Sequence, residues 1–237
     1  RELEAIKKLS FDIHAGEIFG IAGVAGNGQK ELAEAVTGLR KAIGGTITIS
    51  GEDVTTQGAK ARVKKRVGFI PEDRLSMGLV PGMNMEENRI LKEYDTPRFS
   101  KNHILKKKVI HDTVQDEINR YAIKTAGDKS PVSLMSGGNQ QKLLVAREIG
   151  GDPVLLVAVY PSRGLDMGAA EAIHEILLEQ CKKGVAVLLI SEELDELFQM
   201  SDRIGVLCSG EMMAVLDRNE ADYDTIGRLM SGERYEK

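Results

Sequence analysis

The amino-acid sequence predicts an α/β fold, with a mainly parallel sheet core, a small antiparallel β region and an α-helical insertion. Short apolar runs typical of buried strands occupy residues 18–24, 154–159 and Ala186–Ser191. A helical pattern over residues 169–183 joins the last two, and a further strand is predicted at Arg203–Cys208. The runs are apolar throughout rather than alternating, which is typical of parallel strands covered on both faces.

Two alternating segments predict further strands near the N-terminus. Leu9, Phe11 and Ile13 alternate with other residues, which indicates a half-buried strand. Residues 46–50 read Thr-Ile-Thr-Ile-Ser between glycine-containing turns, which predicts an edge or antiparallel strand. The second segment would add the small β region to the core.

The middle of the chain predicts a helical insertion. The strand predicted at Val67–Ile70 ends at a proline, and the pattern then turns helical up to about residue 131. One face of this pattern carries Ile110, Val114, Ile118 and Tyr121. We therefore expect a single domain over residues 1–237, with its core at 1–85 and 132–237 and the insertion at about 86–131.

The composition disfavours several classes of protein. The formal net charge is −4 without a basic excess, so nucleic-acid binding is not expected. The longest apolar stretches, residues 154–160 and 185–190, fall far short of the roughly 20 residues of a membrane-spanning helix, so we expect a soluble chain. Cys181 and Cys208 occur without a Cys-x-x-C spacing or a histidine cluster, which indicates free thiols and no metal site.

A glycine loop follows the first apolar strand and precedes a helical pattern. Residues 23–30, Gly-Val-Ala-Gly-Asn-Gly-Gln-Lys, space their glycines as the phosphate-binding pattern G-x-x-x-x-G-K-[ST] does. Glutamine at the lysine position brings no charge, and lysine at the hydroxyl position cannot hold magnesium. The candidate nucleotide-binding residues are Gly23, Gly26, Asn27, Gly28, Gln29 and Lys30.

A second candidate for phosphate binding lies at residues 136–142, Ser-Gly-Gly-Asn-Gln-Gln-Lys, directly before a predicted helix. Ser136 offers a hydroxyl, while Gly137 and Gly138 leave the first N–H groups of the helix accessible to an anion. Taken alone, this arrangement is also common in helix capping.

The order of these motifs resembles that of the ATP-binding cassette (ABC) family, in which the glycine loop is followed by a Ser-Gly-Gly-x-Gln signature and a Gly-Leu-Asp loop. The matching residues are Ser136, Gly137, Gly138 and Gln140 in the signature and Asp166 in the loop. The amino-acid sequence at residues 71–74 (PEDR), 78–88 and 161–169 is similar to that of the second, C-terminal cassette of tandem ATPase subunits of bacterial sugar and nucleoside importers. The resemblance implies a P-loop NTPase with a RecA-like core, and ATP and magnesium as cofactors.

Compared with this family, the nucleotide pocket departs at the positions that carry catalysis. The expected aspartate and glutamate at the end of a core strand are Val159 and Tyr160, and the switch histidine is Glu192. Glu72 replaces the Q-loop glutamine, as looks usual for second domains of this subfamily. Because phosphoryl transfer depends on positioning and charge neutralisation, we expect this domain to hydrolyse ATP poorly or not at all, with no catalytic residue intact and both cofactors held weakly.

The resemblance also implies partners. Each ATP of a cassette dimer lies between the glycine loop of one domain and the signature of the other. This chain is therefore expected to complete a site of an N-terminal cassette on the same polypeptide, or of a second ATPase subunit. Transmembrane permease subunits would be contacted through Glu72 and the insertion, with the chain peripheral on the cytoplasmic face of the membrane. The abrupt start at Arg1 suggests a piece of a longer protein.

Other interpretations stay open at this point. The surviving glycines predict that nucleotide still binds in this pocket without being hydrolysed. A structural or regulatory dimerisation module that binds no nucleotide explains the same departures but leaves the complete signature unexplained. A cassette protein of ribosomes or DNA is disfavoured, because neither a basic surface nor a long coiled coil is evident.

Overall fold

The computed structural model describes residues 5–125, 127 and 129–234, which form two compact units. Unit 1 comprises the described residues up to Phe69, Pro153–Tyr160, and those from Ile176 onward. Unit 2 comprises Ile70–Asp152 and Pro161–Glu175. The chain passes from one unit to the other within α6 (Met167–Lys182), so each unit is described separately below.

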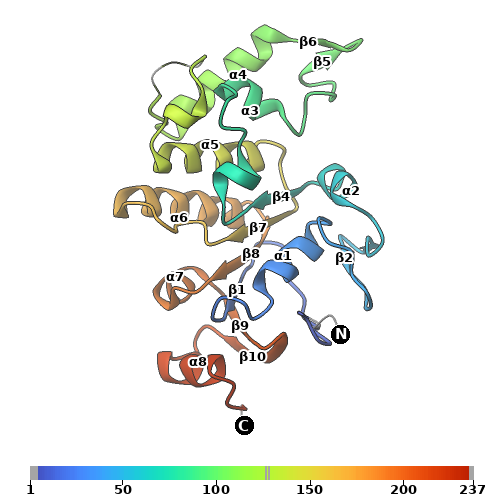
Figure 1. Cartoon of the computed structure of the whole chain (residues 1–237), viewed down its shortest axis with the longest axis vertical. Coiled ribbons are helices and arrows are strands. Elements are labelled where there is room, and N and C mark those ends of the chain that lie inside the picture. Colours follow the sequence, from blue (N-terminus) through green and yellow to red (C-terminus); the bar gives the residue numbers. More distant parts are fainter. Residues whose placement is uncertain (1–4, 126, 128, 235–237) are drawn as a thin grey trace. The chain divides into compact units, whose positions relative to one another are not determined.

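Unit 1 is built on a six-stranded sheet in the order β10-β9-β1-β8-β7-β4 (Figure 1). β1 pairs in parallel with both β8 and β9, β7 pairs in parallel with β8, and β10 is antiparallel to β9. The strands are β1 (Ile18–Ala22), β4 (Val67–Ile70), β7 (Leu155–Val159), β8 (Ala186–Ser191), β9 (Arg203–Cys208) and β10 (Glu211–Asp217). The predicted α/β class with a mainly parallel sheet is confirmed.

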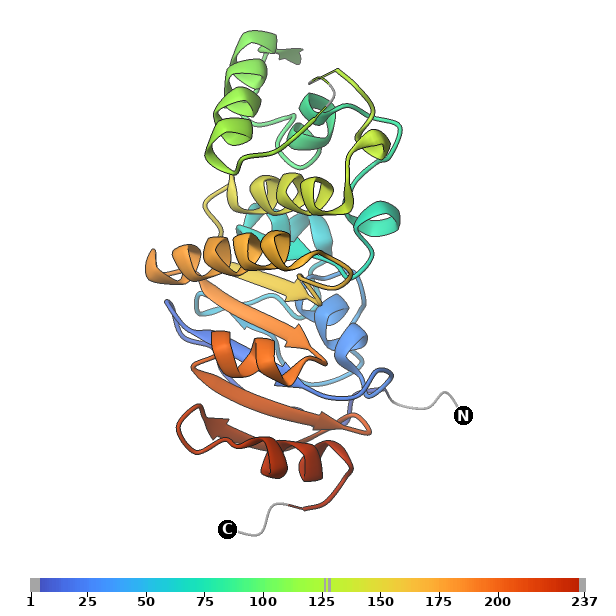
Figure 2. The same ribbon diagram turned by 90° about the vertical axis from the view of Figure 1, so that its left-hand side faces the viewer.

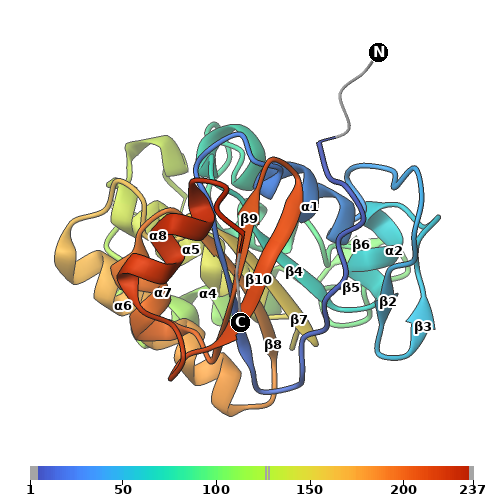
Figure 3. The same ribbon diagram turned by 90° about the horizontal axis from the view of Figure 1, so that it is seen from below.

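Helices lie on both faces of this sheet. α7 (Leu194–Met200) and α8 (Tyr223–Met230), orange and red, lie in front of the strands in Figure 2. Viewed from below, α1 (Gln29–Val36) and α2 (Ala59–Lys64) lie on the other side of the strands (Figure 3). A two-stranded antiparallel hairpin, β2 (Thr48–Ile49) and β3 (Glu52–Asp53), lies beside α2.

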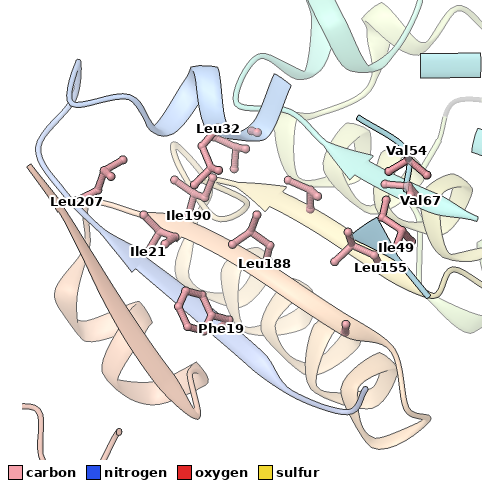
Figure 4. Close-up of a cluster of buried hydrophobic side chains, with 14 residues drawn as sticks. Phe19, Ile21, Leu32, Ile49, Val54, Val67, Leu155, Leu188, Ile190 and Leu207 are labelled. Carbon is pink, nitrogen blue, oxygen red and sulfur yellow. The ribbon is translucent and has the colours of Figure 1, made fainter. Parts of the chain in front are cut away.

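The main core of unit 1 fills the space between the sheet and α1 (Figure 4). Phe19 and Ile21 of β1 contribute to it together with Leu188 and Ile190 of β8, and Leu32 of α1 packs on them. The intervening residues of β1 and β8 point to the opposite face and are also buried. Burial on both faces explains why these strands are apolar throughout.

Unit 2 is mainly helical. It contains α3 (Met85–Ile90), α4 (Lys107–Arg120), α5 (Gly137–Ile149), a π-helical turn (Arg74–Gly78), a 3₁₀ turn (Val132–Leu134), and the hairpin of β5 (Ser100–Lys101) and β6 (Ile104–Leu105). α3 contacts both α4 and α5. Arg89 of α3 is fully buried and binds Glu93 and Glu117 through contacts of 2.5 and 2.6 Å, which ties α3 to α4.

Several local predictions differ from the structure. Leu9, Phe11 and Ile13 pack against the core of unit 1, but their segment forms no strand, because it has no ladder partner among the described residues. The strand predicted at residues 46–50 shortens to Thr48–Ile49. The predicted insertion contains the β5–β6 hairpin as well as helices. Among the described residues, no helix combines the length and apolar character needed to cross a bilayer.

Candidate functional site

The glycine loop lies at the carboxyl end of β1 and leads directly into α1. Gly26 and Gly28 have φ angles of 87° and 109°, a region that favours glycine. A Cβ atom on Gly28 would also lie 2.6 Å from the carbonyl oxygen of Ala5. Glycine is therefore required at Gly28, and the first N–H groups of α1, which follow it, have no intrahelical partners.

Gln29 turns back into this loop instead of outward. Its side chain is 2% exposed, its Nε2 donates to the carbonyl of Val24 at 2.9 Å, and its Oε1 accepts from the N–H of Asn27 at 3.1 Å. A Cβ atom on Gly23 would lie 2.6 Å from Nε2, so the glutamine needs the glycine at that position. The backbone N–H of Asn27, which could otherwise donate to a phosphate, is thus bound by the Gln29 carboxamide.

Asn27 connects the glycine loop to the turn between β9 and β10. Its Oδ1 accepts from the N–H of Ser209 at 2.7 Å, and its backbone carbonyl accepts from Gly210 at 3.0 Å. The carbonyl of Gly210 in turn accepts from the N–H of Lys7 at 2.7 Å. Asn27 therefore holds the loop in place within unit 1, a role that its position in the motif does not reveal.

Lys30 points away from the loop. Its side chain is 68% exposed and its Nζ lies 4.0 Å from Glu34, one turn further along α1. The position that would supply a hydroxyl ligand to magnesium therefore supplies none. Across the described residues, no group of three or more His, Cys, Asp or Glu is arranged to hold a metal ion. Lys30 thus brings a cation, and no oxygen ligand, to the motif position expected to hold magnesium.

Val159, Tyr160 and Glu192, the three other predicted positions of unit 1, lie at the same edge of the sheet. Ala22 pairs with Ser191 and Val159 with Ile190, so Tyr160 and Glu192 follow at neighbouring strand ends. The Tyr160 hydroxyl donates to Glu192 Oε1 at 3.4 Å.

Tyr160 has a φ of 48°, which is rare for a non-glycine residue, and its ring packs against the core. Val159 is buried and carries no polar atom on its side chain. A phenol is a poor base at neutral pH, so Tyr160 is poorly suited to activate water.

The second motif lies in unit 2, at the start of α5. Ser136 is the residue before the helix, and its hydroxyl makes no bond to the first N–H groups of α5. Instead Ser136 Oγ accepts from Asn139 Nδ2 at 2.8 Å, which leaves the hydroxyl proton available for another acceptor. The N–H groups of the first turn have no intrahelical partners either. These donors together suit a phosphate oxygen.

The other predicted residues of unit 2 have structural contacts. Gln140 is buried and donates to the carbonyl of Val132 at 3.0 Å, so it positions the segment before α5 and does not face outward. Asp166 is exposed and accepts from the N–H of Ala169 at 2.9 Å at the start of α6. Glu72 forms an ion pair with Arg163, a contact that the motifs did not predict.

Arg74 is a further residue that the motif analysis did not assign. It follows Glu72 by two positions, and its Nη2 lies where it would be 2.7 Å from a Cβ atom on Gly137. A cation two residues after the Q-loop position was the only signal for it in the sequence.

The structure thus brings the predicted residues together in two groups. Gly23, Gly26, Asn27, Gly28, Gln29, Lys30, Val159, Tyr160 and Glu192 belong to unit 1, and Glu72, Ser136, Gly137, Gly138, Gln140 and Asp166 to unit 2.

Comparison with known proteins agrees with both motifs. A model of the ABC transporter family matches residues 6–158. The chain is 42% identical over 232 residues to the guanosine import ATP-binding protein NupO of Bacillus subtilis (strain 168), covering 98% of this chain and 46% of that protein. It is 38% identical to the glucose import ATP-binding protein TsgD13 of Haloferax volcanii, covering 98% of this chain and 42% of that protein. The chain therefore spans about half the length of the curated relatives it matches.

Solved structures share the fold. A nucleotide-free ATP-binding cassette from an ABC transporter aligns with a TM-score of 0.79 at 21% identity, covering 93% of this chain and 88% of that one. A dimeric ATP-binding cassette in a post-hydrolysis state, bound to ADP and phosphate, aligns with a TM-score of 0.77 at 21% identity, covering 90% of each chain.

Proposed function

We propose, since the chain belongs to the ABC transporter family, that it is a nucleotide-binding domain of an importer for nucleosides or simple sugars. The family match and the fold support a cassette ATPase domain. The names of the similar proteins, which refer to import of guanosine, nucleosides, glucose and ribose, support the substrate class.

One observation carries the finer part of this proposal. The positions of unit 1 expected to neutralise phosphate, hold magnesium and activate water carry Gln29, Lys30, Val159 and Tyr160. Gln29 bonds within its own loop, Lys30 is exposed, and Val159 has no polar side-chain atom, which supports the proposal. In unit 2, Ser136 keeps a free hydroxyl proton at an open helix start. The domain would therefore hydrolyse little or no ATP itself and complete the ATP site of a facing cassette.

Its own pocket would bind ATP weakly. The backbone of the glycine loop offers N–H groups to phosphates, but Gln29 brings no charge and occupies one of these donors. A charge-assisted hydrogen bond contributes about 1.5–3 kcal/mol, so its loss lowers affinity roughly 10- to 150-fold. Glu192, half-buried at the same edge, adds a carboxylate that repels phosphate.

The partners follow from the same proposal. The facing cassette would be an N-terminal domain of the same polypeptide, which is supported by relatives more than twice as long as this chain, or a second ATPase subunit. Permease subunits in the membrane would bind unit 2 near Glu72, which places the domain on the cytoplasmic face of the membrane.

The decisive experiment measures ATP hydrolysis and solute uptake by the assembled transporter carrying Ser136→Ala. Loss of one positioned donor to a transferring phosphoryl group is expected to lower hydrolysis roughly a hundredfold or more. Ser133→Ala, an exposed serine three residues earlier, is the matched control and should retain the full rate.

The isolated 237-residue chain provides the complementary test. It should release no phosphate above background in the presence of magnesium and ATP. Normal hydrolysis by the Ser136→Ala transporter, or rapid metal-dependent hydrolysis by the isolated chain, would each contradict the proposal.

A further inference from the structure

Arg74 holds an unusual position in unit 2. It lies at the start of the π-helical turn Arg74–Gly78, which contacts α5. A Cβ atom on Gly137 would lie 2.7 Å from its Nη2 and 3.4 Å from its Cζ. The guanidinium therefore packs directly against the first glycine of the signature.

The Arg74 side chain lacks a hydrogen-bonded partner within the described part of the chain, although it lies near enough to Asp73 for their charges to interact. Its Nε is buried and makes no hydrogen bond, and neither an ion pair nor a further hydrogen bond involves its guanidinium. A buried donor without an acceptor is costly, and so is a cation at the positive end of a helix such as α5. Both costs are relieved if an anion binds at this place.

The neighbouring carboxylates are engaged elsewhere. Asp73 accepts from the N–H groups of Leu75 and Ser76, both at 3.0 Å. Hydrogen bonds from Ser76 and Leu75 hold the pKa of Asp73 below its ordinary value, and the charge of Arg74 adds a smaller contribution. Glu72 is paired with Arg163. Asp166 accepts from the N–H of Ala169 at the start of α6. None of these carboxylates hydrogen-bonds to Arg74, so its guanidinium can still bind a further anion.

We infer that Arg74 is a further phosphate ligand of the signature side, binding the terminal phosphate of the nucleotide held by the facing cassette. The inference rests on the proposed function, since it takes the signature to face a second nucleotide. The Ser136 hydroxyl and the first N–H groups of α5 supply neutral donors, and Arg74 adds the positive charge. ATP has a terminal phosphate that ADP lacks, so Arg74 would favour binding of ATP over ADP.

The test compares binding of ADP with that of a non-hydrolysable ATP analogue in the assembled transporter. Arg74→Met keeps most of the volume of the side chain and removes its charge, and it should lower affinity for the ATP analogue roughly 10- to 100-fold while ADP affinity stays within about twofold. Arg74→Lys should restore most of the loss. Arg120→Met, the same substitution at an exposed position of α4, should change neither affinity.

Each outcome decides the matter. Equal losses for both nucleotides, equal losses in Arg74→Met and Arg74→Lys, or no difference from Arg120→Met would show that Arg74 only packs on Gly137, and would overturn the inference. Arg74→Gln serves as a second uncharged variant if Arg74→Met melts at a lower temperature. If Ser136→Ala lowers hydrolysis while Arg74→Met matches its control, this inference alone fails. If Ser136→Ala has no effect, the proposed function fails with it.

Discussion

The two phosphate-binding motifs of this chain differ in how they satisfy their hydrogen-bonding groups. In unit 1, the carboxamide of Gln29 binds Val24 and Asn27, so the glycine loop is closed on itself. In unit 2, Ser136 keeps a free proton and Arg74 makes no hydrogen bond among the described residues. A site that binds its own side chains is stable without a ligand, whereas a site with unpaired donors gains by binding one.

The largest effect should come from breaking the closed loop at Gly28. Gly28→Ala places a methyl group 2.6 Å from the carbonyl oxygen of Ala5, at a φ of 109°, and should lower the free energy of unfolding by about 3 kcal/mol. Gly26→Ala is the matched control, because its φ is also positive but no atom lies within 4 Å of the added Cβ. It should cost about 1 kcal/mol. Urea unfolding followed by circular dichroism measures both, and equal losses would contradict the role of Ala5.

The next effect concerns the charge that the loop lacks. Gln29→Lys should raise the affinity of the isolated chain for ATP by about 1.5–3 kcal/mol, or roughly 10- to 150-fold, in calorimetric titration. Hydrolysis should not return, because Val159 and Tyr160 stay in place. Gln29→Met frees the N–H of Asn27 without adding charge and should give a much smaller gain. If both variants bind ATP alike, the missing charge is not what weakens this pocket.

The smallest effect tests an arginine that does have a partner. Arg203 Nε donates to Glu17 Oε1 at 2.6 Å, and Glu17 is 7% exposed. Burial alone would raise the pKa of Glu17, but hydrogen bonds from Arg203 and His14 outweigh it and hold the pKa below 4.5. A lowered carboxyl pKa stabilises the fold above the pKa of the unfolded chain, and this stability is lost as the pH falls through the folded value.

Glu17→Gln should therefore lower the free energy of unfolding by about 1 kcal/mol near pH 7. The difference from the wild type should shrink as the pH falls below about 4.5 and through the lowered pKa at which Glu17 itself becomes protonated. Glu211→Gln removes one partner of the exposed pair with Lys7 and should have almost no effect at any pH. Thermal unfolding between pH 3 and 7 follows both variants, and a difference that persists undiminished at pH 3 would rule out the ion pair as its cause.

The sequence predicted the buried strands well, because residues covered on both faces of a sheet leave a continuous apolar run. The bounds of β4, β8 and β9 match the predicted ones. The strand predicted from the alternation of Leu9, Phe11 and Ile13 was wrong. An extended segment that packs on a core shows the same alternation of apolar residues without pairing with a neighbouring strand. β10 and α8 were not predicted at all.

Within the candidate site, the sequence predicted which residue types stand at the motif positions, but not what their side chains contact. Gln29 folds back into its own loop, and Asn27 binds Ser209, 182 residues further along the chain. Arg74 likewise packs against Gly137, which is far from it in the sequence. No periodicity or local spacing encodes such contacts, because they depend on how separate elements are brought together.

The bond between Asn27 and the β9–β10 turn has a consequence for shorter versions of the protein. A polypeptide ending after β8 would retain every residue of the nucleotide loop, yet it would lack Ser209 and Gly210, which fix the orientation of Asn27. Truncation near the C-terminus would thus deform the glycine loop near the N-terminus without changing any residue of the loop.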